Sequence, residues 1–254
     1  MATVAVYNLK GGVGKTSVAV NLAWAGATLG GLKTLLWDLD GQASASWILA
    51  PGYAATDTVN AGAVLACEVP PADLIVPTAT PGLSLLPADA SLHGLDRIFA
   101  GIDQDGHLGR FLADLGRDYE LIVLDCPPGL GATATQVIRA AAIILLPTIP
   151  SALSHRAVVE LERHLSEGDE ALPPIVPVFT MADMRRAAHR AAIAEGPGYP
   201  VIPMASAVEQ MGERNAPVGA YAPRSAAAKA FEALWHGVAP HLAVANRADE
   251  VSAK

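Results

Sequence analysis

The stretch that decides the fold is "YNLKGGVGKTS", residues 7–17. It joins an apolar run typical of a buried strand, "TVAVYN" (3–8), to an alanine-rich stretch, 16–29, typical of a helix. The glycines let several backbone N–H groups turn toward one point, which the positive end of the following helix also faces. A glycine-rich loop in this strand–helix context that closes on Lys-Thr predicts a phosphate-binding loop.

The chemistry expected of this loop follows from its residue types. Lys15 is expected to lie against the β- and γ-phosphates of a nucleotide, and the Thr16 hydroxyl to bind Mg²⁺. The loop departs from the common pattern G-x-x-x-x-G-K-S/T, because its first glycine would fall at Leu9, and it carries a second lysine, Lys10. A glycine turn that only packs a helix on a strand is the simpler alternative. The residues expected to bind the nucleotide are Lys10, Gly11, Gly12, Val13, Gly14, Lys15, Thr16 and Ser17.

Composition and charge limit the other classes of function. Of the 254 residues, 52% are hydrophobic and 17% are charged, which provides enough apolar surface for one large core. The net charge of −8 argues against a broadly basic surface, so that any DNA contact must come from a local patch. Cys67 and Cys126 lie far apart and predict neither a disulfide framework nor a paired-cysteine metal site. Because strand-like residues begin at Thr3, we expect a reduced, cytoplasmic protein with neither a signal peptide nor an N-terminal helix-turn-helix domain.

Short apolar runs alternate with helical patterns along the chain. Strands are expected at 3–8, 34–40, 83–88, 121–128, 142–148, 174–180 and 199–204, and helices at 16–29, 108–117, 131–141, 151–167 and 225–237. This alternation predicts an α/β fold, a doubly wound, mostly parallel sheet with helices on both faces. One domain is expected over 1–238, with an irregular excursion at 48–82 and a frayed tail at 239–254, which Pro240 interrupts.

The segment "KGGVGKTS" (10–17) resembles the deviant Walker A motif of the ParA/MinD family of P-loop ATPases, in which the first lysine is the signature residue. The resemblance implies a homodimer that sandwiches two ATP molecules, with Lys10 of each protomer reaching the phosphates of its neighbour's ATP. A cation supplied by the partner acts only after association, so that ATP binding would become a dimerisation switch. A solvated loop lysine is the alternative for Lys10.

Two further segments extend the resemblance, which runs from Thr3 to about Val238. In "LLWDLDGQASAS" (35–46), Asp40 matches the residue that polarises the attacking water, and Asp38 is expected on the same side of the strand, where it would order the Mg²⁺ shell or the loop. A strand-end or helix-capping acid is the alternative for Asp38. Gly41 stands where relatives usually carry proline, a departure expected to loosen the loop.

The segment "YELIVLDCPPGLG" (119–131) resembles the Walker B motif and second switch of the same family. Asp125 matches the carboxylate that holds a Mg²⁺-bound water, although a purely structural acid is the alternative. Cys126 is expected to be a buried thiol, and Gly131 to act as a hinge before the next helix. The resemblance thus implies catalytic roles for Lys10, Lys15 and Asp40, and a metal site made by Thr16, Asp38 and Asp125.

Basic residues late in the chain are candidates for DNA contact. Between 180 and 235 there are six bases and five acids, whereas 57–118 holds three bases and nine acids. Few aromatic side chains accompany the bases, which favours contact with the DNA backbone over base readout. Arg224 matches a basic residue that contributes to nonspecific DNA binding in relatives, and a solvated helix face is the alternative for 185–190. The candidates are Arg185, Arg186, Arg190, Arg224 and Lys229.

The resemblance therefore implies a slow, switch-like, Mg²⁺-dependent ATPase whose ATP-bound homodimer binds DNA nonspecifically on the nucleoid. A ParB-like or cargo-adaptor protein would stimulate hydrolysis and release it. The cargo would be a plasmid or a chromosome, or alternatively a protein body such as a carboxysome or a chemoreceptor cluster. A MinD-like membrane-bound ATPase and an ATP-dependent small-molecule ligase remain as alternatives of another class. No membrane contact is expected of the tail, because it has few large apolar residues and carries Asp249 and Glu250.

Overall fold

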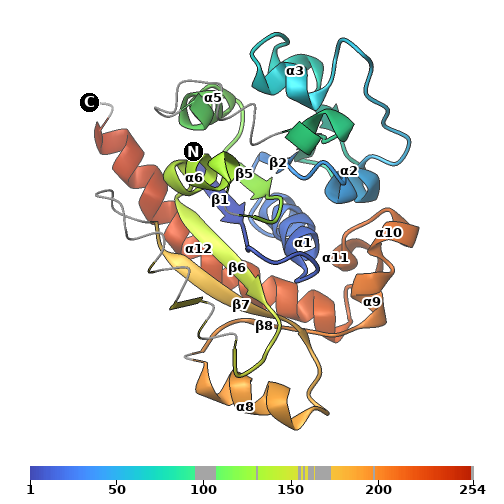
Figure 1. Ribbon diagram of the computed structural model, residues 1–254, viewed down its shortest axis with the longest axis vertical. Coiled ribbons are helices and arrows are strands. Elements are labelled where there is room, and N and C mark those ends of the chain that lie inside the picture. The colour runs from blue at the N-terminus through green and yellow to red at the C-terminus, as the bar shows by residue number, and fades with distance from the viewer. Residues whose placement is uncertain are drawn as a thin grey trace.

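The computed structural model describes residues 1–94, 107–129, 131–153, 173–196 and 198–252, together with isolated positions at 156, 158, 159 and 163. Within these residues eight strands form one sheet in the order β3-β4-β2-β5-β1-β6-β7-β8 (Figure 1). Neighbouring strands run parallel except at one edge, where the short β3 is antiparallel to β4. The strands are β1 (Ala2–Val6), β2 (Thr34–Asp38), β3 (Val76–Pro77), β4 (Leu83–Leu86), β5 (Leu121–Asp125), β6 (Ile143–Thr148), β7 (Ile175–Ala182) and β8 (Val201–Pro203).

Helices cover both faces of the sheet. Because successive strand residues point to opposite faces, Val4 and Val6 of β1 belong to one core and Ala5 belongs to the other. The first core contains α1 (Lys15–Thr28), α2 (Ser44–Leu49), α10 (Met211–Arg214), α11 (Val218–Tyr221) and α12 (Ala226–Ser252). The second core contains α3 (Ala61–Leu65), α5 (His107–Leu115) and α6 (Ala132–Ala140). The remaining described elements are α8 (Ala187–Glu195), α9 (Ser206–Glu209) and the 3-10 turns η1 (Pro71–Asp73) and η2 (Ala90–Gly94).

The predicted doubly wound sheet is confirmed, and the differences lie in the connections. The segment 48–82, predicted to be irregular, contains α3, η1 and β3. Helix α3 forms because the Asn60 side chain accepts the Ala63 N–H at its N-terminus and Val64 and Leu65 are buried. The helix predicted over 151–167 falls mostly outside the described residues.

The segment 239–254, predicted to be a frayed tail, belongs to helix α12 as far as Ser252, and the helix continues through Pro240. Proline lacks the N–H that would bond to the preceding turn, a loss that normally ends a helix. Here Val238 and Leu242 are both buried against the core on either side of the proline, and tertiary packing outweighs the local preference. Figure 1 shows α12 as the long red helix that ends at the C-terminus. None of the described helices is both long and apolar enough to cross a bilayer.

The sheet order brings the predicted site residues to one edge. Strand β1 lies between β5 and β6, and β5 lies between β1 and β2. In this register Asp125 of β5 is paired with Val6 on one side and with Asp38 on the other. The loop that follows β1 therefore leaves the sheet beside both carboxylates, at the carboxyl ends of parallel strands, where doubly wound proteins bind ligands.

Candidate nucleotide-binding site

The loop between β1 and α1 has the backbone that its glycines permit. Gly12 and Gly14 have φ angles of 72° and 85°, which residues with a Cβ rarely adopt. Among the described residues, no side chain caps the N-terminus of α1, so the N–H groups of its first turn point toward the loop without a side-chain partner. An uncapped helix N-terminus behind a glycine-rich loop is suited to bind an anion.

Two side chains attach the loop to the neighbouring strands: Asn8, within the loop, and Thr180, in β7. Asn8 accepts the Lys10 N–H at 2.9 Å and donates to the carbonyl of Pro147 at 2.7 Å. On the other side, the Thr180 hydroxyl donates to the Val13 carbonyl at 2.7 Å. The loop is thus attached to β6 and β7, so its curvature is already set before a ligand arrives.

The two lysines of the loop occupy different environments. Lys15 is only 7% exposed and its Nζ donates to the carbonyl of Lys10 at 3.0 Å, across the mouth of the loop. Burial lowers the pKa of the Lys15 ammonium, while the carboxylates of Asp125 and Asp40 and the Cys126 thiol oppose that change. Lys10 is exposed, and within the described residues its hydrogen bonds are made by its main chain. Lys15 is thus the lysine that belongs to the protomer's own site.

Asp125 is the buried acid at the end of β5. It is fully buried, and neither carboxylate oxygen has a hydrogen-bond partner among the described residues. Burial, and then the negative charge of Asp38, raise its pKa well above the usual value. The Thr16 hydroxyl lies near enough to Asp125 to lower its pKa, but the two groups do not form a hydrogen bond of ordinary geometry. Two unpaired oxygens next to a hydroxyl and a lysine fit the site of a hydrated Mg²⁺ ion.

Asp38 has a different environment from the one predicted. Its two oxygens accept the Asp40 N–H at 3.1 Å, the Ser46 N–H at 2.9 Å and the Ser46 hydroxyl at 2.8 Å. Burial raises the pKa of this carboxyl to about 6, against those hydrogen bonds. Asp38 therefore holds the start of α2 and the loop that carries Asp40, as the loop-ordering alternative predicted, and Ser46 is the partner that sequence reasoning missed.

Asp40 does not share the position of Asp38. Strand β2 ends at Asp38, so the alternation of a strand no longer fixes where Asp40 points. Asp40 is half-buried and lines a pocket of about 630 Å³ together with Tyr7, Cys126 and Gly129. Lys15 and Asp125 feel its charge, so Lys15, Asp40 and Asp125 surround one region.

Gly41, next to Asp40, is in close contact with η2. A Cβ on Gly41 would lie 2.4 Å from His93 Nδ1 and 3.2 Å from the His93 backbone nitrogen. The absence of a side chain thus permits His93 to pack on the loop. This contact does not support the expectation that Gly41 loosens the loop, because His93 occupies the space that a larger residue at position 41 would need.

In the turn after β5, the glycine with a backbone conformation that other residues rarely adopt is Gly129, whereas the sequence suggested Gly131 as the hinge. Gly129 has a φ of 121°, whereas Gly131 caps α6 with a φ of −78° that any residue can adopt. The Tyr7 hydroxyl donates to the Gly129 carbonyl. Cys126 is buried as predicted, and burial raises the pKa of its thiol well above the usual value. Gly129, and not Gly131, is the position where glycine is required.

A second pocket lies on the other side of the loop and was not foreseen. It has a volume of about 370 Å³ and extends from Thr16 and Ser17 to the ends of β7 and β8. Met181 and Met204 line it and are 38% and 58% exposed. Flexible thioether side chains beside a phosphate loop can enclose a flat apolar ring, so this is the candidate nucleobase pocket. The signal in the sequence was the pair of methionines that directly follow strand-like runs.

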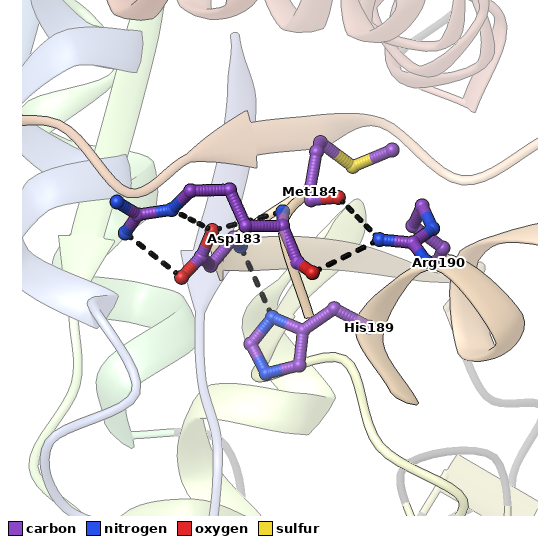
Figure 2. Close-up of polar contacts among 5 residues, drawn as sticks. Asp183, Met184, His189 and Arg190 are labelled. Atoms are coloured by element: carbon purple, nitrogen blue, oxygen red, sulfur yellow. Dashed lines mark hydrogen bonds and ion pairs between the residues drawn. The ribbon is translucent and has the colours of Figure 1, made fainter. Parts of the chain in front are cut away.

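Two of the predicted DNA-binding arginines are engaged within the protein. Arg185 forms a bidentate ion pair with Asp183, at 2.8 Å and 3.0 Å, which lowers the pKa of the Asp183 carboxyl to about 2. Figure 2 shows the same turn, in which Arg190 donates to the carbonyls of Met184 and Arg185 at 2.8 Å and 3.0 Å. The buried His189 accepts the Asp183 N–H at 3.0 Å and fixes the turn from below.

The other candidate cations lie open to solvent. Arg186, at the N-terminus of α8, is exposed, and among the described residues its hydrogen bonds are made by its main chain. Arg224 lies in the turn between α11 and α12, and Lys229 follows on the first turns of α12; both are exposed. Arg186, Arg224 and Lys229 are therefore better placed than Arg185 and Arg190 to meet an external phosphate.

Comparison with known proteins identifies a family and several relatives. The family model described as "AAA domain" matches residues 1–173. Over 192 residues the chain is 31% identical to the chromosome partitioning protein ParA of Caulobacter vibrioides, covering 73% of this chain and 71% of that one. It is similar to the structure of a cobyrinic acid a,c-diamide synthase from Mycobacterium smegmatis with bound ATP analogue and magnesium, at 27% identity, a TM-score of 0.78 and 95% coverage of both chains. MinD from Pyrococcus horikoshii, complexed with Mg-ADP, matches at 24% identity and a TM-score of 0.76 over 93% of this chain and 95% of that one, which supports the fold.

Proposed function

Because the chain belongs to the ParA/MinD family of P-loop ATPases, we propose that it is a ParA-like ATPase that segregates or positions a cargo. The observation that carries the proposal is the loop of residues 10–17, in which Lys15 is buried while Lys10 remains exposed, next to Asp125, which has no hydrogen-bond partner among the residues that the structure describes. Each chain would thus have a site for one nucleotide, and its exposed Lys10 would be available to the nucleotide of a second protomer.

Nucleotide binding is proposed to use groups that the loop already presents. The N–H groups of the glycines and of the first turn of α1 would donate hydrogen bonds to phosphate oxygens. Lys15 Nζ, now bonded to the Lys10 carbonyl at 3.0 Å, would turn to the β- and γ-phosphates. The base would lie in the pocket beside Met181 and Met204.

Asp125 and Thr16 are the residues proposed to hold Mg²⁺, with Asp38 acting through the loop. When bound, the ion would neutralise part of the triphosphate charge. The structure supports this choice because the Asp125 oxygens are unpartnered, whereas those of Asp38 are already bonded to Ser46 and Asp40. Asp40 is proposed to position the attacking water, since it lines the open pocket beside Lys15. Hydrolysis would be slow until a partner completes the site.

The dimer with ATP is proposed to bind DNA nonspecifically through Arg186, Arg224 and Lys229, with Arg185 and Arg190 contributing less. Dimerisation would double the patch, and each phosphate contact adds to affinity. The protein would then act in the cytoplasm, on the nucleoid and without membrane, with a ParB-like or cargo-adaptor protein stimulating hydrolysis. The cargo is a plasmid or chromosome, or in the alternative a protein body.

DNA binding measured against nucleotide state tests this proposal. Fluorescence anisotropy with a random duplex should show tight binding with a nonhydrolysable ATP analogue, and weak binding with ADP or no nucleotide. The slope of log affinity against log salt should fall by about 1 for each phosphate contact that is removed. Binding that is equal in all three nucleotide states, with nucleotide binding verified, would contradict the proposal.

An ATP-dependent ligase is the second candidate, favoured by one observation. The chain is 27% identical to a solved structure titled as a cobyrinic acid a,c-diamide synthase, and a pocket of about 630 Å³ adjoins Asp40. A substrate carboxylate there could meet a transferred phosphoryl group. ATP turnover that depends on an added carboxylic acid and an amine donor, and not on DNA or a partner protein, would favour this reading.

A further inference from the structure

Helices α10 and α11, residues 211–221, connect the nucleotide site to the turn that carries Arg224. We name residues 211–221 the relay segment. It begins at Met211, which is buried in the core under α1, and it ends at Tyr221, three residues before Arg224. Hydrogen bonds from both sides of the nucleotide site reach this segment, one set from α1 and one from α2.

Asn21 is the link from α1. It is fully buried, its Nδ2 donates to the carbonyl of Ser17 at 2.8 Å and contacts Met211 Sδ at 3.3 Å, and its Oδ1 accepts the Val218 N–H at 2.8 Å. Ser17 is the last residue of the phosphate loop, and Val218 is the first of α11. One amide therefore joins the helix that would bind the phosphates to the start of α11.

Trp47 is the link from α2. Its Nε1–H donates to the carbonyl of Gly212 at 3.1 Å, and the Asn215 side chain donates to the carbonyl of Trp47 at 3.0 Å. Helix α2 is in turn fixed to Asp38 through Ser46, and it follows directly on the loop of Asp40. Trp47 is nevertheless 61% exposed, which is unusual for a tryptophan that bridges two helices.

The pocket beside the phosphate loop is lined by residues of α1, α2 and α10. Its lining includes Thr16 and Ser17 of α1, Ser44 and Ile48 of α2, and Met211 and Gly212 of α10. A ligand that fills this pocket would contact the two helices whose junction is bridged by Trp47. A change in the separation of α2 and α10 would therefore accompany a change of ligand.

The far end of the relay segment is bound closely to its surroundings. Gly219 packs on the Trp24 ring so closely that a Cβ would come within 2.2 Å of it. The Tyr221 hydroxyl donates to the carbonyl of Ala207 in α9. A displacement at Gly212 is thus passed along a short, well-packed segment to the Arg224 turn.

We propose that Trp47, Asn215 and Asn21 are positioning residues that couple the nucleotide in the site to the Arg224 turn through the relay segment. The inference rests on the proposed function, since the surface it controls is the proposed DNA-binding surface. The inference predicts a coupling free energy between nucleotide binding and DNA binding. It is measured as the ratio of the DNA affinities with an ATP analogue and with ADP.

Trp47→Phe and Asn215→Ala test the coupling in the full chain. Trp47→Phe removes one hydrogen bond, to the Gly212 carbonyl, and Asn215→Ala removes the bond to the Trp47 carbonyl and a longer one, of 3.4 Å, to the Gly212 carbonyl. Each variant should reduce the affinity ratio about fivefold or more, the factor expected for one such bond. Nucleotide affinity and the melting temperature should stay near wild type. Trp235→Phe is the matched control, because the Trp235 ring is buried in α12 and packs on Gly30, outside the relay segment; its ratio should be unchanged. Unchanged ratios for both Trp47→Phe and Asn215→Ala would overturn the inference and leave the proposed function intact.

The Asn21 variants separate its two bonds. Asn21→Asp keeps an acceptor for the Val218 N–H but loses the donor to Ser17, whereas Asn21→Leu loses both. The affinity ratio should fall less in Asn21→Asp than in Asn21→Leu. Equal ratios in the two variants and wild type would remove Asn21 from the coupling.

Tryptophan fluorescence tests the inference independently of DNA. Because Trp47 is the exposed tryptophan at the α2–α10 junction, exchange of ADP for an ATP analogue should shift the emission of the wild type and of Trp235→Phe, but not of Trp47→Phe. Failure of the wild type to bind DNA would contradict the proposed function but would not contradict a nucleotide-dependent change at Trp47. An emission spectrum that is the same with ADP and with the ATP analogue, when both nucleotides are shown to bind, would contradict the coupling.

Discussion

Asp125 is a buried carboxylate without a partner among the described residues, and such a group destabilises the nucleotide-free protein. We predict that Asp125→Asn raises the free energy of unfolding of this form by about 1–3 kcal/mol at neutral pH. The same variant should lose the strengthening of ATP binding by Mg²⁺. Chemical denaturation and nucleotide titration, each with and without Mg²⁺, measure the two effects. A variant less stable than wild type would instead assign Asp125 a structural role.

A pH dependence follows from the same residue. Because the pKa of Asp125 is raised on folding, its protonated form contributes stability that is lost as pH rises through the folded pKa. Asp38 adds to this loss between its usual pKa of 3.8 and its folded value of about 6. The stability advantage of Asp125→Asn should therefore grow as the solution becomes less acidic. Asp118→Asn, at an exposed site, should show no such trend.

Sequence reasoning was strongest for residues whose environment is set by their own neighbours. The strand–loop–helix pattern placed Lys15 and Thr16, and the strand-ending position placed Asp125, close to where the structure brings them together. Asp38 shows the limit, because its partner Ser46 depends on where α2 begins. Asn21 and Trp47 were missed for the same reason, since their partners are 165 or more positions away in the chain.

At the scale of elements, the contact between the Asp40 loop and η2 can be tested through Gly41 and His93. Gly41→Ala would place its Cβ 2.4 Å from His93 Nδ1, so that η2 or the loop must move, at a cost of about 1–3 kcal/mol. ATP hydrolysis should slow because Asp40 moves with the loop. His93→Ala alone should have a small effect, and in the double variant it should restore most of the loss. A double-mutant cycle measures this, and additive effects would contradict the contact.

The turn between β7 and α8 makes unequal predictions for adjacent arginines. Arg186→Ala should weaken DNA binding and reduce the salt slope by about 1, whereas Arg185→Ala should change both less, because Arg185 is already paired with Asp183. Asp183→Asn frees Arg185 and removes a negative charge, so DNA binding should become tighter. Anisotropy at several salt concentrations compares the three variants. Equal losses for both arginines would mean that the ion pair opens on binding.

Element types were easier to predict than element ends. The parallel strands were found because each is an apolar run between helical patterns. Strands β2 and β5 end earlier than predicted, since Asp38 and Asp125 are the last residues that pair with a neighbouring strand. Helix α3 was missed because five residues are too few to show a helical period. The continuation of α12 was missed because the local effect of Pro240 is visible in the sequence, whereas the burial of Leu242 is not.

At the scale of the whole molecule, Lys10 is the residue proposed to act in association and not in nucleotide binding by its own chain. Its main chain shapes the loop, because its N–H donates to Asn8 and its carbonyl accepts Lys15 Nζ. Its side chain is exposed and makes no hydrogen bond or ion pair within the described part of the chain. Removal of that side chain should therefore leave the protomer's own phosphate loop unchanged.

We predict that Lys10→Ala abolishes the dimer that forms with a nonhydrolysable ATP analogue, while ADP affinity stays within about twofold of wild type. The reason is electrostatic: two triphosphates facing each other repel, and the partner's ammonium is the charge that offsets them. Light scattering measures the mass in each nucleotide state, and Lys33→Ala, which removes an exposed lysine elsewhere, controls for net charge. A Lys10→Ala protein that still doubles its mass with the analogue would place the association energy outside this loop.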